Sequence, residues 1–338
     1  LANKLMESAL ASPSDKSVYH LMVGSSVRHW FTHMAHSSQE YESAFAIGSE
    51  SGNLQYAAYA FGHNMYCRFF QGAPLDALVR ETNSSLAFSR TRRNQWAIDL
   101  LEGGLRIFAS LTDPMLVASE DPGTEQAYLR SVGMHQNLQV ACIYRVLKTC
   151  ELLLLGDYQR ARAWSDEAEA TISTVGTQGL LPWAEHVFCR LLLLTITSET
   201  VTPPALPEAT RQETAALLKQ LQVWSEHNPT NFRHQYLLAR AEIERQGNHP
   251  WEAVNLYDSA IDAAIEGGFL QWAAFAHERL ADFWRSQGSV ELAQTYWQQA
   301  YLLFDEWGAT TKLKSMESDY EQDRKSTRLN SSHITISY

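Results

Sequence analysis

Three histidines on one expected helix are the first residues of this chain whose spacing could support chemistry. His29, His33 and His36 recur at helical intervals, so they share a face of a helix that we expect over residues 17–36. Two histidines one turn apart can bind zinc. No glutamate stands in an H-E-x-x-H arrangement and no Cys or Asp lies nearby, so we interpret the three as a packed or solvated helix face.

A fourth histidine raises the question of phosphotransfer. His277 precedes Glu278, as at the start of a histidine-kinase phosphoacceptor box, but no proline follows at the expected place. The sequence also contains no G-x-x-x-x-G-K, H-R-D, D-F-G or G-x-S-x-G motif. We therefore predict no catalytic, metal-binding or cofactor-binding residue in this chain, and we expect that it is not an enzyme.

Composition limits the partners that the chain can have. The 338 residues are 45% hydrophobic and carry a formal net charge of -11, which argues against a nucleic-acid surface and an anionic membrane surface. The four cysteines form no C-x-x-C pair, so reduced thiols in a cytoplasmic protein are expected. No apolar run approaches the roughly 18 residues of a membrane span. The chain begins at Leu1, and we expect it to be a piece of a longer protein.

One pattern of small residues recurs in three segments. Each segment has two alanines spaced seven residues apart, which is two helical turns, with a glycine before and after the pair. The sets are Gly156, Ala161, Ala168 and Gly176; Gly247, Ala253, Ala260 and Gly267; and Gly288, Ala293, Ala300 and Gly308. The alanines allow close helix approach, and the glycines end helices or open turns.

This pattern predicts an all-α fold built as an antiparallel helix-hairpin solenoid of the tetratricopeptide kind. Aligning Ala253 with Ala293 places Tyr257 opposite Trp297, which gives the small–aromatic–small order typical of such repeats. The array is expected over residues 1–322, with a candidate joint at the proline-rich stretch near 198–208.

The last segment of the chain reads differently. Residues 323–338 are DRKSTRLNSSHITISY, and the composition shifts there from helix-forming residues to serine and threonine. Reverse translation of this segment matches a common short-read sequencing adapter, including a short index within it. We therefore expect residues 323–338 to be a translated adapter that forms a disordered tail.

Two groups of short motifs follow one another in an order that is typical of one protein family. The C-terminal group is Asn228–His234, Ala239, Glu242, Trp251–Ala253, Tyr257, Ala260–Ile261, Gly268–Gln271, Glu278–Arg279, Ala293–Tyr296, Ala300–Tyr301, Trp307–Ala309 and Lys312–Leu313. The upstream group is His29–Trp30, Gly52–Leu54, Ala57–Tyr59, Phe70–Leu75 and Gly156–Tyr158. With these motifs, over about residues 17–320, the chain resembles the helical region of large bacterial multidomain signalling kinases.

This resemblance implies a function for the parent protein. In that family a serine/threonine-kinase-like domain and a signalling ATPase precede the helical array, and a GAF-type sensor and a histidine kinase follow it. ATP and Mg²⁺ would then bind only in the flanking domains. The chain itself is expected to be a sensory or scaffolding module that contacts those domains and takes a protein or peptide ligand on its concave face.

Two alternatives remain open from the sequence. One is the regulatory repeat domain of an ATP-dependent transcription activator, which predicts a helix-turn-helix domain downstream. The other is an α-helical enzyme with an aromatic pocket, which predicts a deep cavity lined by convergent polar groups.

Overall fold

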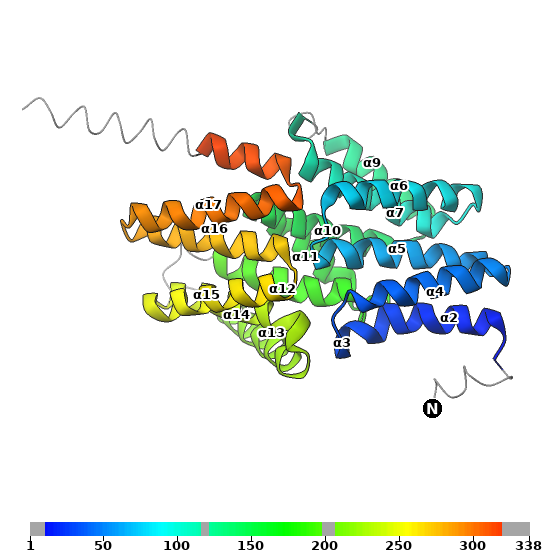
Figure 1. Cartoon of the computed structure of the whole chain (residues 1–338), viewed down its shortest axis with the longest axis horizontal. Coiled ribbons are helices and arrows are strands. Elements are labelled where there is room, and N and C mark those ends of the chain that lie inside the picture. Colours follow the sequence, from blue (N-terminus) through cyan, green and yellow to red (C-terminus); the bar gives the residue numbers. More distant parts are fainter. Residues whose placement is uncertain (1–10, 116–121, 198–206, 320–338) are drawn as a thin grey trace, which may run out of the picture.

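The computed structural model describes residues 11–115, 122–197 and 207–319. Within these ranges every regular element is a helix, which confirms the predicted all-helical class (Figure 1). None of these helices combines the length and the apolar character that crossing a bilayer needs. The adapter-like segment 323–338 lies outside the described residues, as does most of the candidate joint near 198–208.

The helices form two arms and a middle section. The N-terminal arm consists of α2 (Pro13–Val23), a π-helical turn (Gly24–Arg28), α3 (His29–Phe31), α4 (His36–Glu50), α5 (Leu54–Gln71), α6 (Leu75–Thr91) and α7 (Gln95–Thr112). The middle section consists of α9 (Pro122–Met134), α10 (Leu138–Leu155), α11 (Tyr158–Ile172) and α12 (Leu181–Ile196). The C-terminal arm consists of α13 (Glu208–His227), α14 (Pro229–Gln246), α15 (Pro250–Glu266), α16 (Leu270–Ser286), α17 (Val290–Trp307) and a helical stretch over 310–319.

One type of turn joins most successive helices. In the turn after α10, Gly156 is left-handed (φ 89°), and its N–H bonds to the carbonyl of Leu153 while the N–H of Asp157 bonds to that of Leu152. This is a Schellman motif, in which the residue after the left-handed position also caps the next helix. The left-handed residues of the turns with the same long bond are Gly72, Arg93, Gln136, Gly156, Asn248, Gly268, Gly288 and Gly308. Because the turn is so short, the two helices that it joins pack against each other as a hairpin.

The core runs along the inner helices. α5 contacts α7, α7 contacts α10, α10 contacts α12 and α12 contacts α14, while the other helix of each pair lies outside this row. Every residue of α12 except Trp183 is buried. A helix buried on all sides lies in the interior of the protein, and here the polar side chains of Glu185, His186 and Arg190 are buried with it. α12 also contacts α5 of the N-terminal arm, so the inner face is filled by the chain's own side chains.

The two arms meet end to end along a line that we call the seam (Figure 1). Its hydrogen bonds join side chains of one arm to backbone groups of the other. They run from Asn228 and Asn231 to the carbonyls of His29 and Thr32, from His33 to the carbonyl of Gly267, from Gln271 to that of Phe70, from Trp307 to that of Ala73, and from Thr311 to that of Ser110.

The segment before the seam departs from the single helix expected over residues 17–36. The helix widens into a π turn at Gly24, where a Cβ would lie 2.8 Å from the ring of Tyr41. It then stops because Thr32 is extended, with φ -137° and ψ 171°. The break frees the carbonyls of His29 and Thr32 for the seam, which explains why helical periodicity alone predicts this segment wrongly.

Candidate functional site

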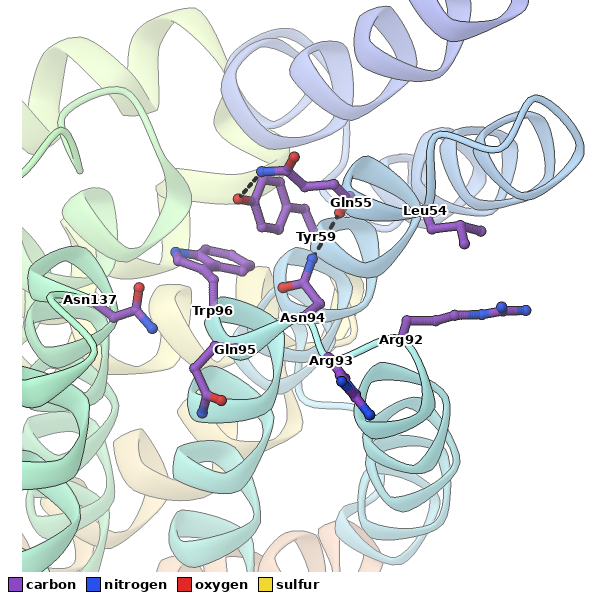
Figure 2. Close-up of a pocket in the computed structure, with 9 residues that line it drawn as sticks. All are labelled: Leu54, Gln55, Tyr59, Arg92, Arg93, Asn94, Gln95, Trp96 and Asn137. Atoms are coloured by element: carbon purple, nitrogen blue, oxygen red, sulfur yellow. Dashed lines mark hydrogen bonds between the residues drawn. The ribbon is translucent and has the colours of Figure 1, made fainter.

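A polar cavity of about 420 Å³ opens at the end of α5 and α7 that faces away from the seam. We call it the turn pocket, because it is bordered by the turn between α6 and α7 and by the N-terminal ends of α5 and α10 (Figure 2). Its lining residues are Leu54, Gln55, Tyr59, Arg92, Arg93, Asn94, Gln95, Trp96 and Asn137.

Aromatic rings form one wall of the turn pocket. The half-buried indole of Trp96 packs edge-to-face on the ring of Tyr59, with centroids 4.7 Å apart. Behind it lies His63, at 5.3 Å, which also bonds to the hydroxyl of Tyr66. Burial lowers the pKa of His63 to about 4, so this imidazole is neutral at pH 7. The wall is therefore an uncharged and rigid support for a flat ring.

Side-chain amides form the floor, and each already uses one N–H in a hydrogen bond. The amide nitrogens of Gln95 and Asn137 donate to Asp99, at 2.7 and 2.6 Å, and that of Gln55 donates to the hydroxyl of Tyr59 at 2.7 Å. Asp99 is 3% exposed and also contacts a ring nitrogen of His135 at 3.0 Å. One bond holds each amide in place, and the second N–H and the oxygen remain as polar groups that the pocket can offer.

Two consecutive arginines stand at the rim. Arg92 and Arg93 are exposed, and within the described residues neither guanidinium is in an ion pair, whereas the nearby Arg90 pairs with Glu102 at 2.8 Å. Figure 2 shows both side chains extending away from the ring of Trp96. The lining residues include no carboxylate, imidazole or thiol. The arrangement is thus suited to binding an anion rather than to acid–base or nucleophilic catalysis.

The small residues singled out in the sequence lie on packed helix faces. Ala161, Ala168, Ala253, Ala260, Ala293 and Ala300 are all buried. Tyr257 is fully buried, whereas Trp297 is half-buried and stacks on Tyr301 with centroids 5.5 Å apart. Gly156 and Gly288 are left-handed, but Gly247 is not: its φ is -68°, and Asn248 takes the left-handed position (φ 59°). The glycine at 247 is therefore not required by its backbone conformation.

The candidate histidines are separated rather than gathered. His29 and His33 lie at the seam, while His36 begins a new helix, α4. In the described part of the chain, no three His, Cys, Asp or Glu side chains lie close enough together to hold a metal ion. His277 is 9% exposed, and burial lowers its pKa to about 4. Its ring lies 5.8 Å from that of Tyr296.

Neither the turn pocket nor the seam was identified from the sequence as a site. Arg92 and Arg93 did carry a signal, because adjacent arginines in a turn are unusual in so acidic a chain. Asn228 and Asn231 were among the residues of the family resemblance, but nothing in the pattern gave their role in the seam. Comparison with known proteins finds no family model, no curated protein and no solved structure that matches this chain.

Proposed function

We propose that this chain is a non-catalytic sensory and scaffolding module, a tetratricopeptide-like solenoid within a bacterial multidomain signalling kinase. In this proposal the flanking domains of the same polypeptide bind ATP and Mg²⁺ and transfer phosphate, and the array relays a conformational change between them. The recurring Schellman turns support the solenoid, because they build successive antiparallel hairpins of similar geometry.

The observation that carries the proposal is the seam. Asn231 is fully buried, and its amide donates to the carbonyls of His29 and Thr32 at 2.8 Å while its oxygen accepts the N–H of Met34 at 3.0 Å. One amide thus ties together segments that lie 197 to 202 residues apart. Aromatic rings also pack across the seam, Trp30 on Phe232 and Phe69 on Trp307, so in this proposal an open state forms only when a ligand or a flanking domain offsets the loss of these contacts.

A ligand on the concave face would be coupled to this opening. α12 contacts both α14 and α5, so a protein or peptide must part the arms before it can occupy the inner face. It would therefore bind the open state better than the closed state, which is the condition for shifting the equilibrium. The flanking domains would sense the shift as a change in the distance between the two arms.

Sequencing the source DNA on both sides of this locus tests the parentage. A frame with an ATPase upstream that continues past Gln322 into a sensor and a histidine kinase would support the proposal. A frame that enters a helix-turn-helix domain would favour a transcription activator instead. A natural stop codon directly after Tyr338 would contradict both the parentage and the adapter origin of the tail.

The variant Asn231→Ala tests the relay. It removes the seam amide, so the radius of gyration from small-angle X-ray scattering should rise and the kinase output of the parent should change. Asn255→Ala is a matched control, because Asn255 lies exposed on α15. Open arms with unchanged kinase output would show that the seam does not transmit a signal.

A further inference from the structure

The turn pocket presents a flat ring, side-chain amides and cations within one cavity. Trp96 lines it with a half-buried indole that is held in place by Tyr59 and His63. Aromatic side chains held in this way are platforms on which nucleobases stack, whatever the base. The wall therefore calls for a ligand with a planar ring.

The amides of the floor favour a ring whose edge carries both a donor and an acceptor. Gln55, Gln95 and Asn137 each use one N–H in an internal bond, which leaves the second N–H and the oxygen of each amide. Side-chain amides of this kind bind the edge of adenine, where an amino group and a ring nitrogen lie side by side. A purine with an exocyclic amino group therefore matches the floor.

The arginines at the rim favour a ligand that carries a negative charge beyond its ring. Arg92 and Arg93 are exposed and lack ion pairs among the described residues, in a chain whose net charge is -11. Guanidinium groups bind phosphate with two parallel hydrogen bonds, which gives geometric specificity as well as affinity. The guanidinium of Arg92 lies over the ring of Phe88, 5.5 Å from its centroid, and both arginines are exposed, so their N–H groups are accessible to a phosphate.

Arg93 also occupies a position where a side chain is costly. Its φ is 52°, in a type of turn that has glycine at the same position after α5, α10 and α15. The left-handed conformation is unfavourable for a residue with a Cβ. A strained residue beside a cavity is a reason to ask what its side chain does there.

We propose that the turn pocket binds a purine nucleotide, with the base on Trp96, its polar edge on the side-chain amides, and the phosphate on Arg92 and Arg93. The volume of about 420 Å³ falls within the range of about 300–1,000 Å³ that small-molecule sites occupy. This inference goes beyond the relay function, because it names a small ligand at a site remote from the seam.

Isothermal titration calorimetry of the whole chain with GMP and AMP tests the proposal. UMP, guanosine and inorganic phosphate serve as partial probes, and a tetraglutamate peptide represents an acidic protein segment. We expect GMP and AMP to bind more tightly than any of these, because they combine the larger stacking surface of a purine, an exocyclic amino group that uracil lacks, and a phosphate.

The variant Arg93→Gly removes one guanidinium while the backbone conformation becomes easier to adopt, so the fold is preserved. It should weaken purine-nucleotide binding by about tenfold or more, as the loss of a charge-assisted hydrogen bond predicts. Asn248→Gly makes the same backbone change in the other arm and should leave binding unchanged, since Asn248 (φ 59°) is remote from the turn pocket.

Four results would overturn the proposal. They are the absence of heat with GMP and AMP at millimolar concentration, equal affinity for UMP or for inorganic phosphate, affinity unaffected by Arg93→Gly, and preference for the tetraglutamate peptide. Each of these results concerns nucleotide binding by the chain itself, so the nucleotide site can be disproved while the proposed relay is unaffected. A parent without kinase domains would in turn leave the nucleotide site intact.

Discussion

At the scale of single residues, the core contains an acid that is uncharged at neutral pH. Glu185 of α12 is fully buried, and burial raises its pKa to about 8, although the hydrogen bond from Gln235 acts in the opposite direction. The amide of Gln235 donates to one carboxyl oxygen at 2.8 Å. The other oxygen has no partner within the described residues. Burying the neutral acid here costs less free energy than burying the carboxylate.

The variant Glu185→Gln should therefore be more stable than the unsubstituted chain, and the difference in stability should grow as the pH rises. The pKa of Glu185 is raised on folding, so its contribution is fully present below about pH 4.5, the ordinary value for glutamate, and is lost as the pH rises through about 8. At pH 7 the gain should be about 2–4 kcal/mol. Urea unfolding at pH 5, 7 and 8.5 measures it. Glu226→Gln, at an exposed position, should show no such trend.

A second buried carboxylate has the opposite character, because it is paired. Glu242 of α14 accepts two hydrogen bonds from Arg279 of α16, at 2.7 and 2.9 Å, and both side chains are buried. Glu242→Ala removes the main partner of a buried guanidinium, whose contact with Asp282 is longer at 3.9 Å, so it should lower the free energy of unfolding by about 3–5 kcal/mol. The double variant Glu242→Leu with Arg279→Met should recover most of this loss in the same urea titration. A double variant as unstable as the single one would mean that the pair contributes more than charge compensation.

At the scale of elements, the turns determine how the helices follow one another. The glycines at 156, 288 and 308 could be predicted as helix ends, because glycine adopts φ > 0 at little cost, whereas the pattern named Gly267 and the left-handed residue is Gly268. The turns that have Arg93, Gln136 or Asn248 at the left-handed position could not be predicted in this way, because no glycine stands at that position in the sequence. Turn geometry is shared across the array, but its glycine signature is present in only some of the turns.

Replacing a left-handed glycine of these turns by alanine should lower stability, and replacing a left-handed side chain by glycine should raise it. At Gly156 (φ 89°) an added Cβ would meet only Lys312 at 3.8 Å, an ordinary contact, so Gly156→Ala costs backbone strain alone, about 1–2 kcal/mol. Gln136→Gly relieves the same strain (φ 60°) and should stabilise by up to about 1 kcal/mol. Thermal unfolding followed by circular dichroism would measure both. A stabilising Gly156→Ala would disprove the assignment of a left-handed turn there.

Contacts between neighbouring helices could be predicted from the sequence, whereas the contacts of the seam could not. Helical spacing at Ala253, Ala260, Ala293 and Ala300 reports contacts between neighbouring helices, which is why the hairpin pattern and the helical class could be predicted. The seam joins helices that are far apart along the chain. Asn231 looks like an ordinary residue in the first turn of a helix, and only the fold brings it to the carbonyls of His29 and Thr32.

At the scale of the whole molecule, the seam contains buried histidines that acid will charge. Burial lowers the pKa of His29 to about 4 and that of His234 to about 3, and His234 stacks on Phe269 with centroids 4.1 Å apart. Burial lowers the pKa of His33 as well. Stability from such groups is present above the ordinary pKa of about 6.5 and is lost as the pH falls toward the folded value.

Acidification from pH 7 to about pH 4.5 should therefore open the arms before the hairpins unfold. The radius of gyration should rise while the helical circular dichroism signal is retained. His234→Phe removes a titrating group but keeps a flat ring on Phe269, so it should move the opening to lower pH. His227→Gln, at an exposed position on α13, should not. Loss of helix and opening at the same pH would show that the arms are not separate from the core.

The seam also has a consequence for how the chain folds. The bond from Trp307 to Ala73 spans 234 residues, whereas each hairpin forms between helices that are adjacent in sequence. Contacts between distant residues carry a loop-closure entropy cost and slow folding, so the hairpins should form early and the seam last. Trp30 packs against Phe232 across the seam, with centroids 5.5 Å apart, so the part of the tryptophan fluorescence change that is lost in Trp30→Phe should report the late step in stopped-flow refolding. A newly synthesised chain would then remain open until its C-terminal helices have left the ribosome.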